Sequence, residues 1–156
     1  MIDAEGYRAN VGIILVNVKG GLFWAKRIGE DAWQFPQGGI HESESAQQAA
    51  FRELYEEVGV TEDSVEVIGC TEDWLRYKIP KHLIRHNQTP CCIGQKQRWF
   101  LLRFTGDESD FCLNNTNKPE FDQWCWVDQE KPQKSVISFK RDVYAEALKE
   151  LLPLIN

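Results

Sequence analysis

The side chains best placed to do chemistry lie in the segment RELYEEVG, at 52–59, where three of eight residues are glutamates. Glu53, Glu56 and Glu57 are spaced i, i+3 and i+4, so on a helix their carboxylates share one face. At a spacing of ~6 Å and an effective dielectric of ~20, each pair repels by ~2–3 kcal/mol. Either this face is solvated or a strongly positive group lies against it.

Both readings of the acidic face are open on the segment alone. Charged faces of helices are commonly solvated, and Arg52 lies four residues before Glu56, where the two can form an ion pair. Against this, Glu42 and Glu44 extend the acids backwards to a glycine loop, and glycines let a backbone approach a ligand closely. Carboxylates on adjacent turns are suitable oxygen ligands for Mg²⁺, which typically bridges carboxylates to substrate phosphates.

The distribution of charge favours a substrate that carries phosphates. The net charge of −6 argues against a non-specific nucleic-acid binder. However, 42–66 holds eight acids and one base, whereas 74–106 holds seven lysines or arginines and no acid. Within the basic block, 74–88 interleaves cations with aromatic residues, which fits either a nucleic-acid groove or a solvated loop with apolar anchors. A phosphorylated substrate with a bound cation would use both kinds of surface.

Length and composition predict one globular domain over 1–156 with a core of its own. No apolar run approaches the ~18–20 residues that span a bilayer, and the first ten residues lack the apolar segment of a secretory signal. The five cysteines form no C-x-x-C pair, so we expect reduced thiols rather than disulfides or zinc. We therefore expect a cytoplasmic protein that does not associate with a membrane.

The glutamates need a helix to position them, and the sequence marks both of its ends. Ser45 and Gln48 have capping-box spacing, Ser43 is an alternative cap, and Gly59 suits the position after the last turn. Elsewhere, β-branched and aromatic runs predict strands that alternate with two well-separated helices, which indicates an α/β domain with a mixed sheet between helices. The predicted strands are 11–18, 21–28, 65–70, 99–104 and 123–127, with extended chain at 33–40 and a final amphipathic helix over 138–156.

The stretch GGIHESESAQQAAFRELYEEVGV, at 38–60, resembles the Nudix box, the signature of the Nudix hydrolase family. Gly38, Glu44 and the run at 52–60 fill its defining positions at the matching spacing. The resemblance implies one Nudix domain over 1–156 with the α/β/α sandwich of that family. It also implies a bound divalent metal and hydrolysis of a nucleoside diphosphate linked to another group.

Motifs outside the box extend the resemblance from Tyr7 to Tyr144. WQFPQGGI, WLRYK, PEFDQW and SFKRDVY are similar to segments of the bacterial RNA pyrophosphohydrolases, a group within the family. This implies hydrolysis of the 5′-triphosphate end of RNA to a 5′-monophosphate with release of pyrophosphate, a step that promotes mRNA decay. Because that group is similar to plant-type diadenosine tetraphosphate hydrolases, a dinucleoside polyphosphate hydrolase is the alternative. A Nudix-fold binding protein without activity is a third reading, although no box glutamate is missing.

The resemblance also implies roles for single carboxylates. Glu53, Glu56 and Glu57 are the expected metal ligands, of which Glu53 and Glu57 are the firmer. Glu120, in PEFDQW, is expected to be either a further ligand or the base that acts on water, so that Glu53, Glu57 and Glu120 form the catalytic set. The expected metal is Mg²⁺, with Mn²⁺ or another divalent cation as the alternative.

Residues around these ligands are expected to support them. The fork of Arg52 would orient a glutamate rather than touch the substrate, and Glu44 would be structural, near a helix N-terminus where acids are favoured. A carbonyl from the loop at Gly38 and Gly39 could also reach the metal.

Substrate contacts are expected from basic and aromatic side chains outside the box. Arg8 and Lys140 would bind phosphate, and the Arg27 plane with the Phe139 ring would sandwich a splayed base of single-stranded RNA. Arg27 could instead be a solvated residue and Phe139 a core residue. The expected partner is an RNA 5′ end or a nucleoside polyphosphate; a protein activator is compatible with the resemblance, but no pattern in the sequence specifies one.

Overall fold

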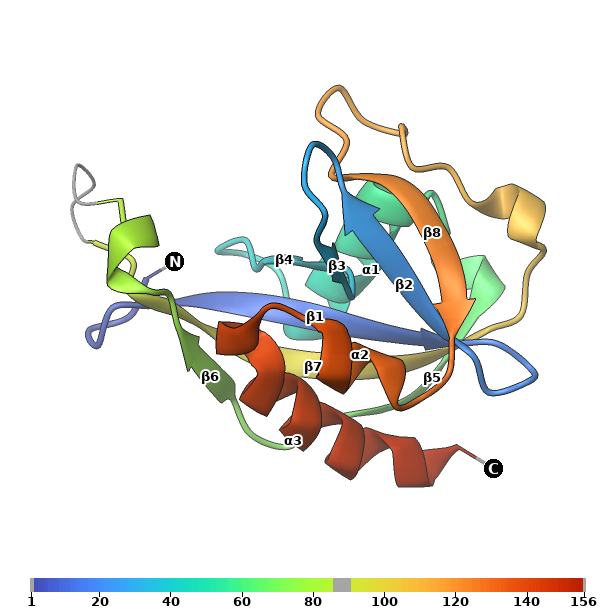
Figure 1. Cartoon of the computed structure of the whole chain (residues 1–156). Helices are drawn as coiled ribbons and strands as arrows, with labels where there is room; N and C mark the ends of the chain where they lie inside the picture. Colours follow the sequence, from blue (N-terminus) through green and yellow to red (C-terminus); the bar gives the residue numbers. More distant parts are fainter. Residues whose placement is uncertain (1, 86–90, 156) are drawn as a thin grey trace.

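A mixed eight-stranded sheet lies between helices in the computed structural model, which describes residues 2–85 and 91–155. Helix α1 covers one face of the sheet, and helices α2 and α3 cover the other (Figure 1). The predicted α/β/α sandwich with a mixed sheet is therefore confirmed. The elements are β1 (Tyr7–Val16), β2 (Leu22–Arg27), β3 (Trp33–Gln34), β4 (Gln37–Gly39), α1 (Ala46–Val58), β5 (Val65–Cys70), β6 (Leu75–Lys78), β7 (Gly94–Phe104), β8 (Phe121–Val127), α2 (Lys131–Ser135) and α3 (Arg141–Leu151).

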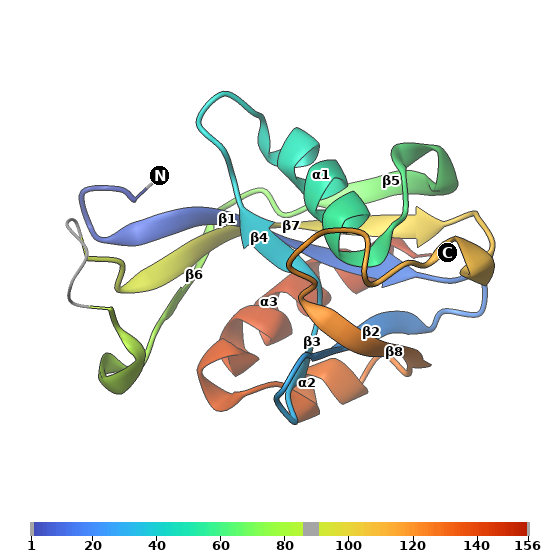
Figure 2. The same ribbon diagram turned by 90° about the horizontal axis from the view of Figure 1, so that it is seen from above.

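Strands β1 and β7 form the centre of the sheet (Figure 2). They pair in parallel, from Tyr7 opposite Gly94 to Val16 opposite Arg103. The main path runs β3-β2-β1-β7-β5, while β4 pairs with β1, β6 with β7 and β8 with β2, all antiparallel. The short strand β4 pairs with β1 and is followed directly by the loop that leads into α1.

Two apolar cores follow from the alternation of side chains along β1. Ile13 and Leu15 are buried in the core beneath α1, and Ile14 and Val16 are buried in the core beneath α3. Burying one such side chain stabilises the fold by roughly 1.5–3 kcal/mol relative to leaving it exposed. The two cores therefore pack α1 against one face of the sheet and α3 against the other. Within the residues that the structure describes, no helix is both long and apolar enough to cross a membrane.

Helix α1 begins and ends where the sequence predicts. The Ser45 hydroxyl accepts from the Gln48 backbone N–H (3.1 Å), and the Gln48 side chain accepts from the Ser45 N–H (2.8 Å), which completes a capping box. Gly59 adopts the left-handed conformation (φ 83°), and its N–H donates to the Tyr55 carbonyl (2.9 Å). Leu54 is fully buried in the core beneath α1, and Glu57, one turn later, is buried as well, so packing of the helix turns part of its acidic face inward.

Several elements differ from the prediction in length. Strand β1 begins at Tyr7 rather than at 11, and β7 begins at Gly94 rather than at 99, because the two continue to pair along polar residues that carry no apolar alternation. Strand β6 lies in the basic segment 74–88, which was predicted as a loop or groove; residues 86–88 of that segment lie outside the described residues. The final helix is shorter than 138–156 because 3₁₀ turns flank it at both ends.

Candidate active site

A pocket of about 290 Å³ opens beside β4, beneath the acidic face of α1. It gathers residues that lie far apart in the sequence, from β2, β3, β4, α1, the loop before β8 and the turn before α3. A larger cavity of about 950 Å³ lies elsewhere, against the β1–β2 turn and the end of β8, and none of the predicted site residues lines it. The lining residues of the smaller pocket are Arg27, Gln34, Gln37, Gly38, Glu53, Glu57, Glu120 and Lys140.

The two interior glutamates of this pocket are poorly neutralised. Glu57 is 9% exposed, and its Oε2 has no hydrogen-bond partner among the described residues. Burial raises the pKa of Glu57 well above its ordinary value, and the neighbouring Glu53 carboxylate raises it further. Burial likewise raises the pKa of Glu53. Gly38 is required here for space, because a Cβ at this position would collide with the Glu53 carboxylate.

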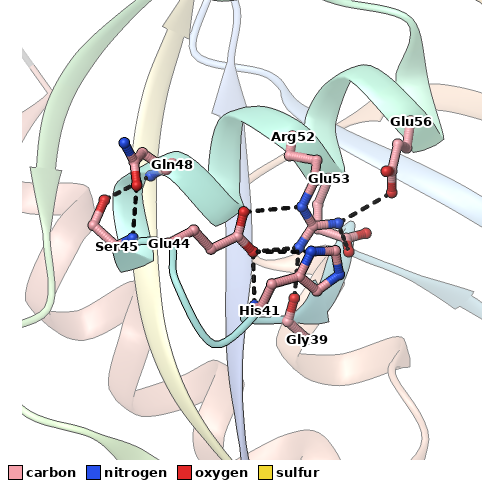
Figure 3. Close-up of polar contacts among 8 residues, drawn as sticks. All are labelled: Gly39, His41, Glu44, Ser45, Gln48, Arg52, Glu53 and Glu56. Atoms are coloured by element: carbon pink, nitrogen blue, oxygen red, sulfur yellow. Dashed lines mark hydrogen bonds and ion pairs between the residues drawn. The ribbon is translucent and has the colours of Figure 1, made fainter. Parts of the chain in front are cut away.

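Arg52 binds three carboxylates, one from the loop before α1 and two from the helix itself (Figure 3). Its Nε and Nη2 donate to the two oxygens of Glu44 (3.1 and 2.6 Å), and Nη2 also donates to the Gly39 carbonyl (2.7 Å). Its Nη1 donates to Glu53 (2.8 Å) and Glu56 (3.2 Å). The hydrogen bonds from the Arg52 guanidinium to Glu44 are the chief reason that the pKa of Glu44 is lowered to about 2. One fork thus ties the glycine loop to the helix and fixes one oxygen of Glu53.

Two cations face the carboxylates across the pocket. Arg27 lies 3.4 Å from Glu120 and 3.2 Å from Glu30, with each of these side chains about half exposed. Lys140 is 7% exposed and donates to Gln34 (3.1 Å); it forms no ion pair with any carboxylate in the described part of the chain. Burial lowers the pKa of Lys140 to about 8. The pocket therefore holds positive charge that anionic phosphates would complement.

The remaining predicted residues lie around this pocket rather than in it. Arg8 lines an adjoining pocket of about 570 Å³ that shares Glu53 with the first. The Phe139 ring is half-buried and packs 5.8 Å from the ring of Tyr77. Glu56 has a side chain that is 42% exposed and contacts Arg52, so it does not line the pocket of Glu53 and Glu57.

Three polar residues of this region are absent from the predicted set. Gln34 and Gln37 line the pocket, and Tyr77, at 8% exposure, accepts a hydrogen bond from Gln37 Nε2 (3.2 Å). The backbone N–H of Gln37 also stabilises the Glu57 carboxylate. The signal in the sequence is the pair of glutamines that interrupts the aromatic segment 33–40 next to its glycines.

The residues fit a divalent cation, although not as a complete set of ligands. Among residues 2–85 and 91–155, no three His, Cys, Asp or Glu side chains are gathered into a ready-made metal cluster. A bound cation would nevertheless give the unsatisfied oxygen of Glu57 a partner and would reduce the repulsion between the Glu57 and Glu53 carboxylates. Oxygen-only donors favour Mg²⁺ or Mn²⁺ over softer metals. The assignment of individual ligands stays a prediction.

Solved structures support the fold assignment. The chain is similar to a Caenorhabditis elegans Ap4A hydrolase in a binary complex, with 16% identity and a TM-score of 0.67 over 94% of this chain and 98% of that one. It is also similar to the Escherichia coli dihydroneopterin triphosphate pyrophosphohydrolase, with 21% identity and a TM-score of 0.68 over 92% and 98%. At these identities the likeness concerns the fold alone.

Curated relatives are much closer in sequence. The chain is 56% identical over 155 residues to the RNA pyrophosphohydrolase of Hahella chejuensis, covering 99% of this chain and 96% of the relative. It is 59% identical to the RNA pyrophosphohydrolase of Thioalkalivibrio sulfidiphilus, covering 99% and 90%. The NUDIX domain model matches residues 6–147. This chain therefore belongs to the NUDIX domain family.

Proposed function

We propose that this protein hydrolyses the 5′-triphosphate end of RNA to a 5′-monophosphate and releases pyrophosphate, a reaction that promotes mRNA decay. The observation that carries the proposal is the pocket that sets Glu53 and Glu57 opposite the buried cation Lys140. Relatives that are 56–59% identical over nearly the whole chain are named RNA pyrophosphohydrolases. The family resemblance and the charges of the pocket thus favour the same kind of substrate.

Nudix hydrolases generally require a divalent metal, and we propose Mg²⁺ as the ion, with Mn²⁺ as a substitute. Glu53 and Glu57 would hold it, with Glu120 as a further ligand and Glu56 a ligand only if it released Arg52. When bound, such a cation supplies neutralisation of phosphate oxygens and lowers the pKa of water. The buried repulsion between the glutamates supports this assignment.

The protein's own side chains would bind and orient the substrate. The fork of Arg52 holds one oxygen of Glu53, whose side chain lines the pocket. Lys140 would contact phosphate from a position shielded from water, where its charge acts at low dielectric, and Arg8 would contact phosphate from the adjoining pocket. Glu120 would accept a proton from water, which requires it to leave its ion pair with Arg27.

The test is incubation of the purified protein with 5′-triphosphorylated RNA and Mg²⁺, followed by separation of the released pyrophosphate from orthophosphate. Pyrophosphate and a 5′-monophosphorylated RNA are expected. A kcat/KM that is greater on diadenosine tetraphosphate than on triphosphorylated RNA would favour the dinucleoside polyphosphate hydrolase. Binding of nucleotides without any turnover would identify a binding protein instead.

We further propose that 1–156 acts as one Nudix domain and that the protein works in the cytoplasm. The family match over 6–147 supports the first statement, and the five free cysteines support the second. Limited proteolysis that released a smaller, still active fragment would contradict the single unit. Measuring activity with and without a cell extract tests for a protein activator.

A further inference from the structure

A group of cations lies at the end of the sheet beyond α1. We name it the basic shelf: Arg76 and Lys78 on β6, Lys96 on β7, and the rings of Tyr7 and Trp74 beside them. Lys96 shares a face of β7 with Phe100, because side chains alternate along a strand, and Phe100 belongs to the core beneath α1. In Figure 2 the ends of β1 and β7, with β6 at their edge, extend past α1.

The shelf holds like charges against each other. Arg76 lies directly opposite Lys96 in the β6–β7 pair, and Lys78 follows two residues along the same face. Like charges that face each other across two strands destabilise the pair. Lys96 contacts Asp3 (3.0 Å), but no carboxylate in the described part of the chain pairs with Arg76 or Lys78, both of which are exposed. An external anion would relieve the repulsion.

Aromatic rings lie directly beneath these cations. The Arg76 guanidinium sits over the Tyr7 ring, 5.7 Å from its centroid, and the Lys96 ammonium lies 5.1 Å from the centroid of Trp74. Grooves that follow single-stranded nucleic acid combine backbone-binding cations with aromatic or guanidinium planes on which bases stack. The shelf has both parts, so its chemistry fits a single-stranded polynucleotide better than an isolated phosphate.

Strand β1 connects the shelf with the proposed active site. Tyr7 of the shelf is followed by Arg8, which lines the pocket that shares Glu53 with the catalytic pocket. Because side chains alternate along a strand, Arg8 lies on the opposite face of β1 from Tyr7. From β4, which borders the catalytic pocket, three strand spacings lead through β1 and β7 to β6, a distance of roughly 14 Å. A strand whose 5′ end occupies the pocket would reach the shelf only with nucleotides beyond the first few.

We propose that the basic shelf binds the body of a single-stranded RNA substrate downstream of its 5′ end. This inference rests on the proposed function, because it takes the RNA as the occupant. The shelf would lower KM for long substrates and leave the chemical step and short substrates unaffected. Its contribution would fall with added salt, since phosphate contacts release counterions.

The test compares a triphosphorylated dinucleotide with a triphosphorylated single strand long enough to cross the shelf. The variant Arg76→Glu/Lys78→Glu is expected to raise KM for the long strand about 10-fold, to weaken the salt dependence of KM, and to leave kcat/KM for the dinucleotide unchanged. The control Lys19→Glu/Lys149→Glu makes the same change in net charge at exposed sites, one on the β1–β2 turn and one on α3, and should leave both substrates near wild type.

Two further measurements keep the proposal separate from the proposed function and from misfolding. Binding of a 5′-monophosphorylated strand to the wild type and to both variants, followed by fluorescence anisotropy, tests the shelf without any hydrolysis. The milder variant Arg76→Gln/Lys78→Gln should show a smaller rise in KM with an unchanged melting temperature. An equal loss on the dinucleotide and the long strand, or no loss on the long strand, would overturn the proposal. An unchanged affinity of the Arg76→Glu/Lys78→Glu variant for RNA would also overturn it and would favour an acidic protein as the occupant of the shelf.

Discussion

Two sets of glutamates around α1 differ in how the protein treats their charge. Glu44 and Glu56 both contact the Arg52 guanidinium, and the pKa of Glu44 falls to about 2 as a result. Glu57 is more buried than either, yet one of its oxygens has no partner and its pKa is raised. The chain thus neutralises its outer carboxylates itself and leaves one oxygen of Glu57 without a partner among the described residues. Glu53 belongs to both sets, with one oxygen on Arg52.

The largest expected effect comes from the inner set. We expect Glu57→Gln and Glu53→Gln each to reduce kcat about 10²–10³-fold, the scale of losing a group that stabilises developing charge, while the fold stays intact. Rates near wild type in Mg²⁺ would refute the assignment for that residue. Steady-state hydrolysis of triphosphorylated RNA at saturating substrate, with circular dichroism as the control for folding, makes the measurement.

The same Glu57→Gln change should stabilise the metal-free protein. A carboxyl whose pKa is raised in the folded state costs stability as pH rises above its ordinary value of 4.5. At pH 7 in a chelator, the melting temperature should therefore rise, by roughly 3 °C for each 1 kcal/mol gained. Added Mg²⁺ should raise the melting temperature of the wild type more than that of the variant. If the variant is less stable than the wild type in chelator, the charge of Glu57 does not destabilise the metal-free fold, and the two sets of glutamates do not differ in this way.

Arg52→Ala should cost about 3 kcal/mol of stability, because it leaves the half-buried carboxylates of Glu44 and Glu53 without their partner. Arg52→Lys keeps the charge but loses the fork, so it should recover only part of the loss. Urea denaturation of the three proteins gives the comparison. Equal stabilities for the lysine variant and the wild type would mean that charge alone, rather than the bidentate geometry, holds the outer set.

Glu44→Gln should have a smaller effect that depends on pH. Because the folded-state pKa of Glu44 is about 2 against an ordinary value of 4.5, its stabilisation is fully present above pH 4.5 and is lost as pH falls through about 2. The difference from wild type should be roughly 1–2 kcal/mol at pH 7 and should shrink in acid. Thermal melts across this pH range would show the convergence, and a constant difference would contradict the pairing.

Glu56→Gln should have the smallest effect, below about 0.5 kcal/mol, since its contact with Arg52 is partly exposed and solvent screens it. Activity should fall only a few-fold unless Glu56 releases Arg52 to reach a metal. A loss as large as that of Glu57→Gln would place Glu56 in the inner set. Measuring kcat at several Mg²⁺ concentrations distinguishes weaker metal binding from a slower chemical step.

Local signals in the sequence were sufficient for the helix that carries the site. The capping box of Ser45 and Gln48 and the glycine at 59 are interactions within one segment, so spacing alone predicts them. The mixed sheet between helices also followed from alternation of strand and helix patterns. The spacing of Glu53 and Glu57 placed both carboxylates on one face of the helix. It did not show which of the glutamates would pair with Arg52.

The rest of the site depends on contacts between segments distant in sequence. The family resemblance implied that Glu120 and Lys140 belong to the site, but spacing alone does not place them in one pocket with Gln34, because the sheet and the turn before α3 bring them together. Strand β6 was missed because its four residues lie in a polar segment and its hydrogen bonds come from β7. Phe139 illustrates the same limit, since its contact with Tyr77 is a product of tertiary packing.

The parallel pairing of β1 with β7 has a consequence for the growing polypeptide. Tyr7 finds its partner at Gly94, and Val16 finds its partner at Arg103. During synthesis the first long strand must therefore wait, with one edge unpaired, until β7 has emerged, and such non-local pairing is slow. The Arg52 contacts can form earlier, within 39–56, but Glu120 and Lys140 arrive later still. We expect a nascent chain to gain hydrolytic activity only near the end of its translation.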